Sequence, residues 1–246
     1  MKLPKIEYPI YDITLPLSKQ QIKYRPFLSK EDKLLLMAKE SDDPIVIFNN
    51  IKQVVNNCIL TENINVDDIP IIDIQYLFIN LRARSIGEIV EMEYICQNNV
   101  MKNGELKKCM HVVPIEIDLL SIHVDVPKDF SFKVELTNTL GVNMKSPSLE
   151  TSIKLENSNE TEVEKAFKSI IDCIEYIYDE NGIYYKKDIP PKELSDWLDD
   201  LPTKYLAKLG EFFDKYPKMT KDIHFKCPKC GWEEVIKLEG LQDFLE

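Results

Sequence analysis

The feature that most constrains this chain is a pair of cysteines near its end. Cys227 and Cys230 enclose Pro-Lys and are followed by Gly231, a spacing that turns the chain sharply and directs both sulfurs toward one point. Two thiolates at this spacing make half of a tetrahedral metal site. Two further ligands must therefore come from elsewhere in the sequence.

The best candidates for the missing ligands are Cys96 and Cys109. Cys96 ends one predicted strand and Cys109 begins the next, so their thiols would face each other across a hairpin. Four thiolates suit zinc, and two such hairpins would form a zinc ribbon with one structural zinc per chain. The wide spacing of this pair is less diagnostic than a second Cys-x-x-Cys. Two alternatives stay open: His111 replaces Cys109 as fourth ligand, or the cysteines bind no metal.

The sequence contains no convincing catalytic constellation. His111, His123 and His224 form no His-x-x-x-His or Glu-flanked helical motif. Cys227 and His224 could mimic a thiol–imidazole pair, but neither a helix N-terminus nor an orienting Asn accompanies them. We therefore predict a protein that is not an enzyme and has no small-molecule substrate.

Neither the Cys-x-x-Cys pair nor the two remaining cysteines indicates a redox-active site. A redox Cys-x-x-Cys normally opens a helix after a strand, whereas Gly231 and a predicted strand follow Cys230. Cys58 and Cys173 lie on apolar faces of predicted helices, where a buried structural thiol is expected.

Composition narrows the class of partner. The chain has 246 residues, 44% hydrophobic and 30% charged, with a net charge of −11. These are values of a globular protein, and so acidic a chain is a poor candidate for sequence-independent nucleic-acid binding. The first residues lack the apolar run of a signal peptide, and no window approaches the roughly 20 apolar residues of a membrane span. We expect an intracellular protein with reduced thiols, whose partners are proteins rather than membranes or nucleic acids.

Hydrophobic periodicity predicts an α+β fold in three parts. The first, 1–87, combines an N-terminal hairpin with helices. The second, 88–150 together with 223–246, is a β-rich, zinc-ribbon-like domain. The third, 151–222, is a helical insertion that begins after a polar link. The expected strands are 8–15, 22–27, 88–96, 109–119, 122–126, 130–136, 223–225 and 232–238, and the expected helices include 30–39, 44–60 and 72–84.

Two details of this prediction concern turns and helix length. Asn103-Gly104 is a hairpin-tip signal between the strands that carry Cys96 and Cys109. Apolar residues at helical spacing from Glu160 onward, including Ile170, Ile174 and Tyr178, predict one helix that ends only at Asn181-Gly182. Two more helices follow, each started by proline, which would make the insertion a three-helix unit.

The C-terminal tail has two interpretations. Over 238–246, Leu241, Phe244 and Leu245 would lie on one side of a short helical turn. This apolar side either packs against the sheet of its own chain or acts as a hook that inserts into a neighbouring subunit.

Several segments, in the same order along nearly the whole chain, resemble the T4-like phage baseplate hub assembly family. They are Pro9-Ile10-Tyr11 with Leu15-Pro16, Tyr24-Arg25-Pro26-Phe27-Leu28, Glu31-Asp32-Lys33-Leu34-Leu35-Leu36-Met37-Ala38, Asp172-Cys173-Ile174-Glu175-Tyr176-Ile177-Tyr178, Phe225-Lys-Cys-Pro-Lys-Cys-Gly, and Leu238-Glu-Gly-Leu-Gln-Asp-Phe.

This resemblance implies a contractile-tailed bacteriophage and a protein needed to build the central hub of the tail baseplate. It implies binding to other hub proteins, as subunit or assembly factor, and no enzymatic activity. The implied location is the host cytoplasm during assembly, and the resemblance leaves open whether the protein stays in the virion tail baseplate.

The alternative function is a zinc-ribbon nucleic-acid-binding or transcription regulatory protein. A ribbon of that kind should carry a basic hairpin. Here the lysines of the ribbon (Lys226, Lys229 and Lys237) are offset by Glu233, Glu234 and Glu239. The charge pattern therefore favours the protein-binding interpretation.

Overall fold

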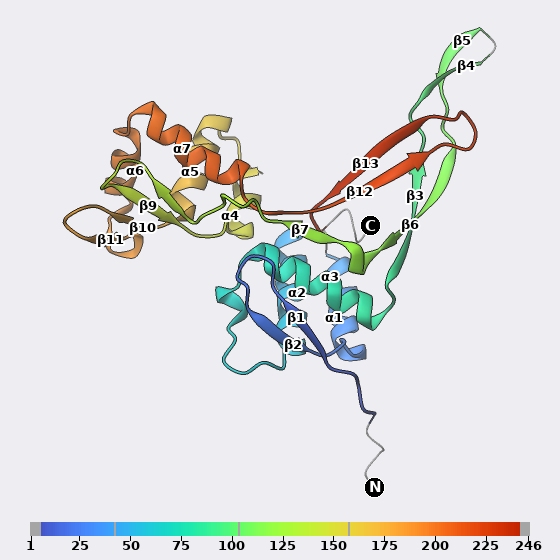
Figure 1. The fold of residues 1–246 in the computed structure, drawn as a ribbon, viewed down its shortest axis with the longest axis horizontal. Helices are drawn as coiled ribbons and strands as arrows, with labels where there is room; N and C mark the ends of the chain where they lie inside the picture. The colour runs from blue at the N-terminus through green and yellow to red at the C-terminus, as the bar shows by residue number, and fades with distance from the viewer. Residues whose placement is uncertain (1–5, 42, 103, 157, 242–246) are drawn as a thin grey trace. The chain divides into compact units, whose positions relative to one another are not determined.

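The structure is a computed structural model that describes residues 6–41, 43–102, 104–156 and 158–241. Its helices and small antiparallel sheets confirm the predicted α+β class (Figure 1). The chain divides into two compact units. Unit 1 comprises Met1–Met37, Asn50–Asp125 and Lys218–Glu246, and unit 2 comprises Ala38–Asn49 and Val126–Pro217. The division into three separately folding domains stays a prediction.

The N-terminal part of unit 1 contains the predicted hairpin, followed by helices. Acidic residues stand in the first turn of α1 and arginines in the last turn of α3, as the helix dipole favours. The elements are β1 (Tyr11–Thr14), β2 (Gln21–Tyr24), α1 (Ser29–Lys39), α2 (Pro44–Cys58), the 3-10 turn η1 (Val66–Asp68) and α3 (Ile71–Ser85). Residues 38–39 of α1 and 44–49 of α2 belong to unit 2.

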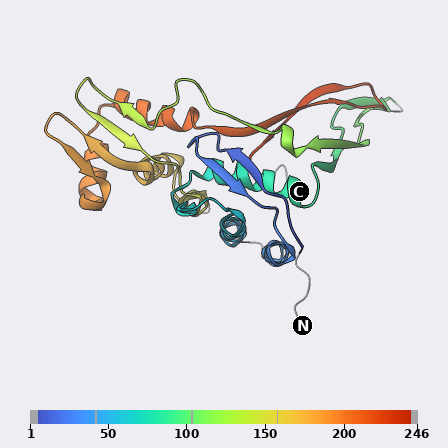
Figure 2. The same ribbon diagram turned by 60° about the horizontal axis from the view of Figure 1, so that its bottom comes forward.

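One buried acid fixes the hairpin against α3. Asp73 has no exposed surface, yet it interrupts the most apolar stretch of the chain. Its carboxylate accepts hydrogen bonds from the backbone N–H of Leu17 at 2.8 Å and of Ser18 at 2.7 Å. Because these N–H groups belong to the β1–β2 turn, the turn is held over the helix (Figure 2).

The rest of unit 1 is built from two hairpins. The first is long: β3 (Ile89–Ile95) pairs with β6 (Val112–Asp118), and β4 (Asn99–Lys102) pairs with β5 (Glu105–Lys108) beyond them. At its predicted tip, Gly104 has φ +81°, which favours glycine, and Asn103 lies outside the described residues. The second hairpin pairs β12 (Lys218–Lys226) with β13 (Glu233–Glu239). After the turn η2 (Leu119–Ser121), β7 (His123–Asp125) pairs with β12.

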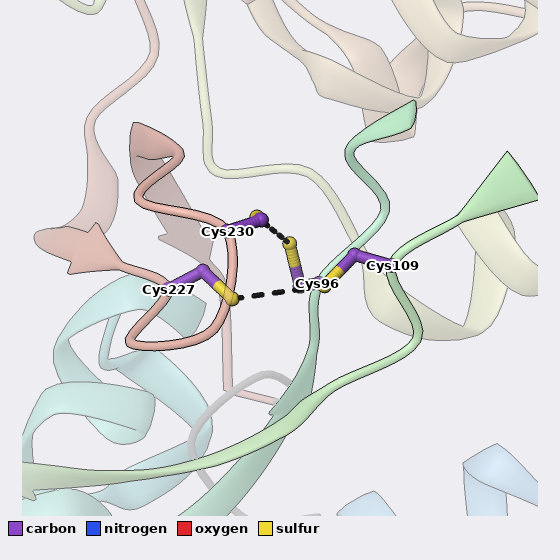
Figure 3. A group of neighbouring side chains, drawn as sticks. All are labelled: Cys96, Cys109, Cys227 and Cys230. Carbon is purple, nitrogen blue, oxygen red and sulfur yellow. Dashed lines mark hydrogen bonds between the residues drawn. The ribbon is translucent and has the colours of Figure 1, made fainter. Parts of the chain in front are cut away.

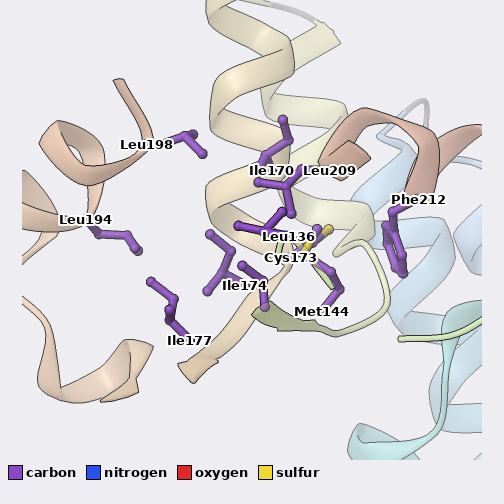
Figure 4. Close-up of a cluster of buried hydrophobic side chains, with 11 residues drawn as sticks. Leu136, Met144, Ile170, Cys173, Ile174, Ile177, Leu194, Leu198, Leu209 and Phe212 are labelled. Atoms are coloured by element: carbon purple, nitrogen blue, oxygen red, sulfur yellow. The ribbon is translucent and has the colours of Figure 1, made fainter. Parts of the chain in front are cut away.

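Unit 2 is a four-stranded antiparallel sheet with helices on one face. Residues from both the sheet and the helices are buried together in its core (Figure 4). The sheet order is β11 (Ile183–Tyr185), β10 (Ile174–Tyr178), β9 (Gly141–Met144), β8 (Lys133–Glu135), and the helical elements are α4 (Leu149–Glu156), α5 (Glu162–Cys173), η3 (Lys186–Asp188), α6 (Pro191–Asp199) and α7 (Thr203–Asp214).

The predicted long helix ending at Asn181-Gly182 is wrong in its second half. The helix ends at Cys173, and Ile174–Tyr178 is the strand β10. A register shift between Ile174 and Tyr176 lets Ile174 and Ile177 both enter the core, so a bulged strand imitates helical spacing. The helix α4 was not predicted; it ends at Glu156, within the first two residues of the expected polar link at 155–162. At the start of α5, Thr161 and Glu164 form a capping box.

Gly141 provides the first test of unit 2. A Cβ built on Gly141 would lie 2.2 Å from the Tyr178 hydroxyl, because the tyrosine ring covers the glycine directly across the strand pair. We expect Gly141→Ala to displace the ring and destabilise unit 2 by about 1–3 kcal/mol. Gly182→Ala is the matched control, since its Cβ would meet nothing within 4 Å. Its expected effect is within about 0.5 kcal/mol.

The measurement can be confined to unit 2 because the chain's two tryptophans lie one in each unit. In a Trp232→Phe background, urea unfolding followed by Trp197 fluorescence reports unit 2 alone. Equal midpoints for the Gly141→Ala and Gly182→Ala variants would contradict the assigned role of Gly141.

Candidate metal centre

The two hairpins of unit 1 bring four cysteines together. Cys96 follows β3 and Cys109 follows β5, whereas Cys227 and Cys230 lie in the turn between β12 and β13. Ligand atoms of all four lie within 4.8 Å of one another (Figure 3). The sequence therefore identified all the members of the cluster, and residues more than a hundred positions apart meet in it.

The sulfur separations match a tetrahedral thiolate site. The Sγ atoms of Cys96 and Cys230 are 3.7 Å apart, and those of Cys109 and Cys227 are 3.9 Å apart. Zinc–sulfur bonds of about 2.3 Å in a tetrahedron place sulfurs about 3.8 Å from one another. A disulfide needs about 2.0 Å, and the four cysteines are free thiols. The donor set and its spacing fit zinc.

The backbone around the sulfurs is shaped by two turns. Gly231 adopts φ +72° directly after the second hairpin's cysteines, and its N–H donates to the Cys227 carbonyl at 2.9 Å. In the first hairpin Met110 adopts φ +52° after Cys109, and its N–H donates to the Cys96 carbonyl at 3.0 Å. Each turn lets the chain bend around its sulfurs. Of the two residues with positive φ, only Gly231 could be expected from the sequence, because glycine favours this conformation.

An apolar shell surrounds three of the four thiols. Cys96, Cys109 and Cys227 are at most 2% exposed, whereas Cys230 is partly exposed. Tyr94 and Phe225 cross edge-to-face at 4.7 Å between centroids, which joins the two hairpins beside the sulfurs. The other apolar neighbours are Val100, Val113, Ile115 and Ile236. Such a shell restricts solvent access to a metal site.

Cys96, Cys109 and Cys230 have shifted pKa values. Burial raises the pKa of Cys96 to about 12 and raises the pKa of Cys109. The pKa of Cys230 is lowered to about 6, first by the backbone N–H of Trp232 and further by the Asn98 amide, whose Nδ2 lies 3.6 Å from the sulfur. Cys230 therefore ionises before Cys96 and Cys109, and it is the most exposed thiol of the cluster. No sequence motif pointed to Asn98, because its role depends on the fold.

The alternative ligand and catalytic pairs are placed elsewhere. His111 is not a member of the sulfur cluster, and its backbone carbonyl accepts from the Cys96 N–H at 2.9 Å. His224 is exposed and adjacent to buried Phe225, so its side chain is on the opposite face of β12 from the cluster. Cys58 and Cys173 are buried, and burial raises their pKa values to about 11 and about 12, which keeps both thiols protonated.

Two other predicted features are partly described. Leu241 is buried, which agrees with packing of the tail on its own chain, but Phe244 and Leu245 lie outside the described residues. The hook therefore stays a prediction.

Among the described residues, no helix combines the length and apolar character needed to cross a bilayer.

Comparisons with known proteins identify the family. A family model described as T4 bacteriophage base plate protein matches residues 8–246, nearly the whole chain. A search of curated proteins and a search of solved structures each returned no match. The match covers both hairpins of the cysteine cluster and all of unit 2. This chain therefore belongs to the T4 bacteriophage baseplate protein family.

Proposed function

We propose that this protein takes part in assembling the central hub of the phage tail baseplate, without enzymatic activity, by binding other hub proteins. The family match over residues 8–246 supports a baseplate role. The six resembling segments of the sequence support the hub in particular. The protein would act in the host cytoplasm during assembly, as a lasting subunit or as a factor that leaves.

We further propose that Cys96, Cys109, Cys227 and Cys230 hold one structural zinc. The observation that carries this proposal is the closed set of four sulfurs within 4.8 Å. Catalytic zinc sites keep one position open for water or substrate, whereas sites with four protein ligands are structural. The zinc would tie the two hairpins of unit 1 together, so its role is to hold a binding surface in shape.

Ion pairs on the ribbon argue against the nucleic-acid alternative. Lys226 pairs with Glu233 at 2.5 Å, and Lys218 pairs with Glu239 at 2.8 Å. Lys237 lies 3.7 Å from the same Glu239. Because these lysines are partnered by glutamates, β12 and β13 present no uncompensated basic stripe for phosphates.

The hub proposal is tested by quantitative peptide mass spectrometry of purified phage particles beside the infected-cell lysate. Copies at a small fixed ratio to a known hub protein would identify a hub subunit. Abundance in the lysate together with absence from particles would identify an assembly factor that leaves. Absence from every tail-protein complex in both samples would contradict the proposed role.

A further inference from the structure

The long hairpin of unit 1 exposes one continuous face. Along β3, residues 89, 91, 93 and 95 are exposed, and those between them are at least partly covered. The alternation continues into β4, where Val100 packs against the cysteine cluster and Met101 is 68% exposed on the other side. We call this exposed side of β3–β6 and β4–β5 the outer face.

Strand pairing fixes the order of side chains on the outer face. From the base, Ile89 is opposite Asp118, Glu91 is opposite Glu116, and Glu93 is opposite Pro114. Ile95 is then opposite Val112. Toward the tip, Asn99 is opposite Lys108 and Met101 is opposite Leu106. The face therefore has an acidic base, an apolar middle and a basic, apolar tip.

The series of side chains along the outer face partly matches the same series read in the opposite direction, as it would be in a second, antiparallel copy. Taking Ile95 as centre, Lys108 lies across from Asn99 four residues toward the tip, and the Glu91–Glu116 pair lies four residues toward the base. Six residues out, the Met101–Leu106 pair at the tip corresponds to the Ile89–Asp118 pair at the base, where Ile89 is the apolar member. At about 3.3 Å per residue, these positions lie about 13 Å and about 20 Å from the centre.

The exposed apolar residues also fall on this pattern. Leu106 is 67% exposed and Ile89 is 53% exposed, so apolar area stands at both ends of the row. Ile95 and Val112 are 42% and 44% exposed at its centre.

Like charges directly opposite each other destabilise a strand pair, and Glu91 faces Glu116 in this way. A cation supplied from outside would relieve this repulsion.

We propose that two copies of this chain associate through their outer faces, running antiparallel about a two-fold axis at Ile95 and Val112. Lys108 of each copy then meets the Glu91–Glu116 pair of the other. The Met101–Leu106 pair of each tip covers Ile89 of the other base. A two-fold interface is self-complementary, so every such contact occurs twice. The occupant is a second copy because Lys108 supplies the cation that the Glu91–Glu116 pair lacks. The remaining acids of the face, Glu93 and Asp118, and the net charge of −11 limit the strength of this association.

Charge exchange tests this arrangement with the full chain in sedimentation equilibrium from micromolar to near-millimolar concentration. We expect a monomer–dimer equilibrium for the natural sequence. Lys108→Glu should raise the dissociation constant by about tenfold or more, because it places a third acid beside two acids at two symmetric sites. Adding Glu116→Lys to Lys108→Glu should restore most of the affinity.

Lys102→Glu is the matched control, because Lys102 lies on the other side of β4 from the outer face and should leave the dissociation constant unchanged. Circular dichroism and melting of each variant show that the exposed substitutions leave the fold intact. A natural chain that stays monomeric, equal effects of Lys108→Glu and Lys102→Glu, or failure of the double exchange would overturn the proposal. A monomer that binds a different baseplate protein through Lys108 would also overturn it, and would assign the face to that protein.

Discussion

Replacing Cys227 by serine should remove the metal and unfold the hairpins of unit 1. A structural zinc contributes an apparent binding free energy of about 10–16 kcal/mol in small zinc domains at pH 7. That energy is as large as the whole stability of an ordinary domain, about 5–15 kcal/mol. Cys227 is fully buried between the hairpins, so serine can neither replace the thiolate nor pack as a larger apolar residue would.

The measurement compares zinc content, circular dichroism and limited proteolysis of Cys227→Ser with those of Lys229→Ser. Lys229 is exposed in the same turn and is not in the sulfur cluster, so it controls for a new serine at this site. In a Trp232→Phe background, Trp197, in unit 2, should keep its native fluorescence in both variants because the loss is confined to unit 1. A Cys227→Ser protein with full zinc content and unchanged melting would contradict the structural role of the site.

The second large effect is expected at a buried ion pair in the N-terminal part of unit 1. Arg25 Nη2 lies 3.0 Å from Glu31 Oε1, with side chains 7% and 0% exposed. The guanidinium also donates to the Pro26 and Asn57 carbonyls, each at 2.9 Å. Glu31 additionally accepts from the Leu28 N–H at 2.9 Å. The network joins β2, α1 and the end of α2.

Arg25→Met should destabilise this part of the chain by about 3–5 kcal/mol, because it leaves the Glu31 carboxylate buried without its main partner. The matched control is Lys30→Met, which removes the other cation within reach of Glu31, at 3.4 Å and 70% exposed. Lys30 is itself mostly in water and Glu31 keeps Arg25 in this variant, so the control should unfold within about 1 kcal/mol of the natural protein. Urea unfolding followed by circular dichroism measures both, and similar losses for the two variants would contradict the assignment.

The same pair predicts a pH dependence. Burial by itself would raise the pKa of Glu31, but the hydrogen bonds from Arg25 and the Leu28 N–H outweigh burial and lower this pKa below its ordinary value of 4.5. A lowered folded-state pKa means that the stabilisation is present above pH 4.5 and is lost as the pH falls below it. The difference in unfolding free energy between the natural protein and Glu31→Gln should therefore shrink on acidification from pH 7. A difference that grows on acidification would be contrary to this sign.

The cluster members could be predicted because thiols carry a strong local signal. Cys227-Pro-Lys-Cys-Gly specifies half of a site, and the strand patterns around Cys96 and Cys109 supply a hairpin for the other half. What could not be predicted is the set of groups that act only through the fold. Asn98 reaches Cys230 across the two hairpins, and Met110 adopts a left-handed turn that its residue type does not announce.

The fold shows the same limit of local information. Helices with charged residues at their ends, such as α1 and α3, were predicted to within a residue or two at each end. The strand β10 was predicted as helix because the bulge after Ile174 changes which residues face the core. A bulge is stabilised by pairing with β9, which is remote in sequence, so local periodicity carries no trace of it.

Native mass spectrometry of the full chain purified without added metal or chelator, with elemental analysis of the same sample, tests the zinc site. We expect one zinc per chain, lost in Cys96→Ser, Cys109→Ser, Cys227→Ser and Cys230→Ser and retained in Cys58→Ala. A natural chain that is folded, fully reduced and free of metal would contradict it.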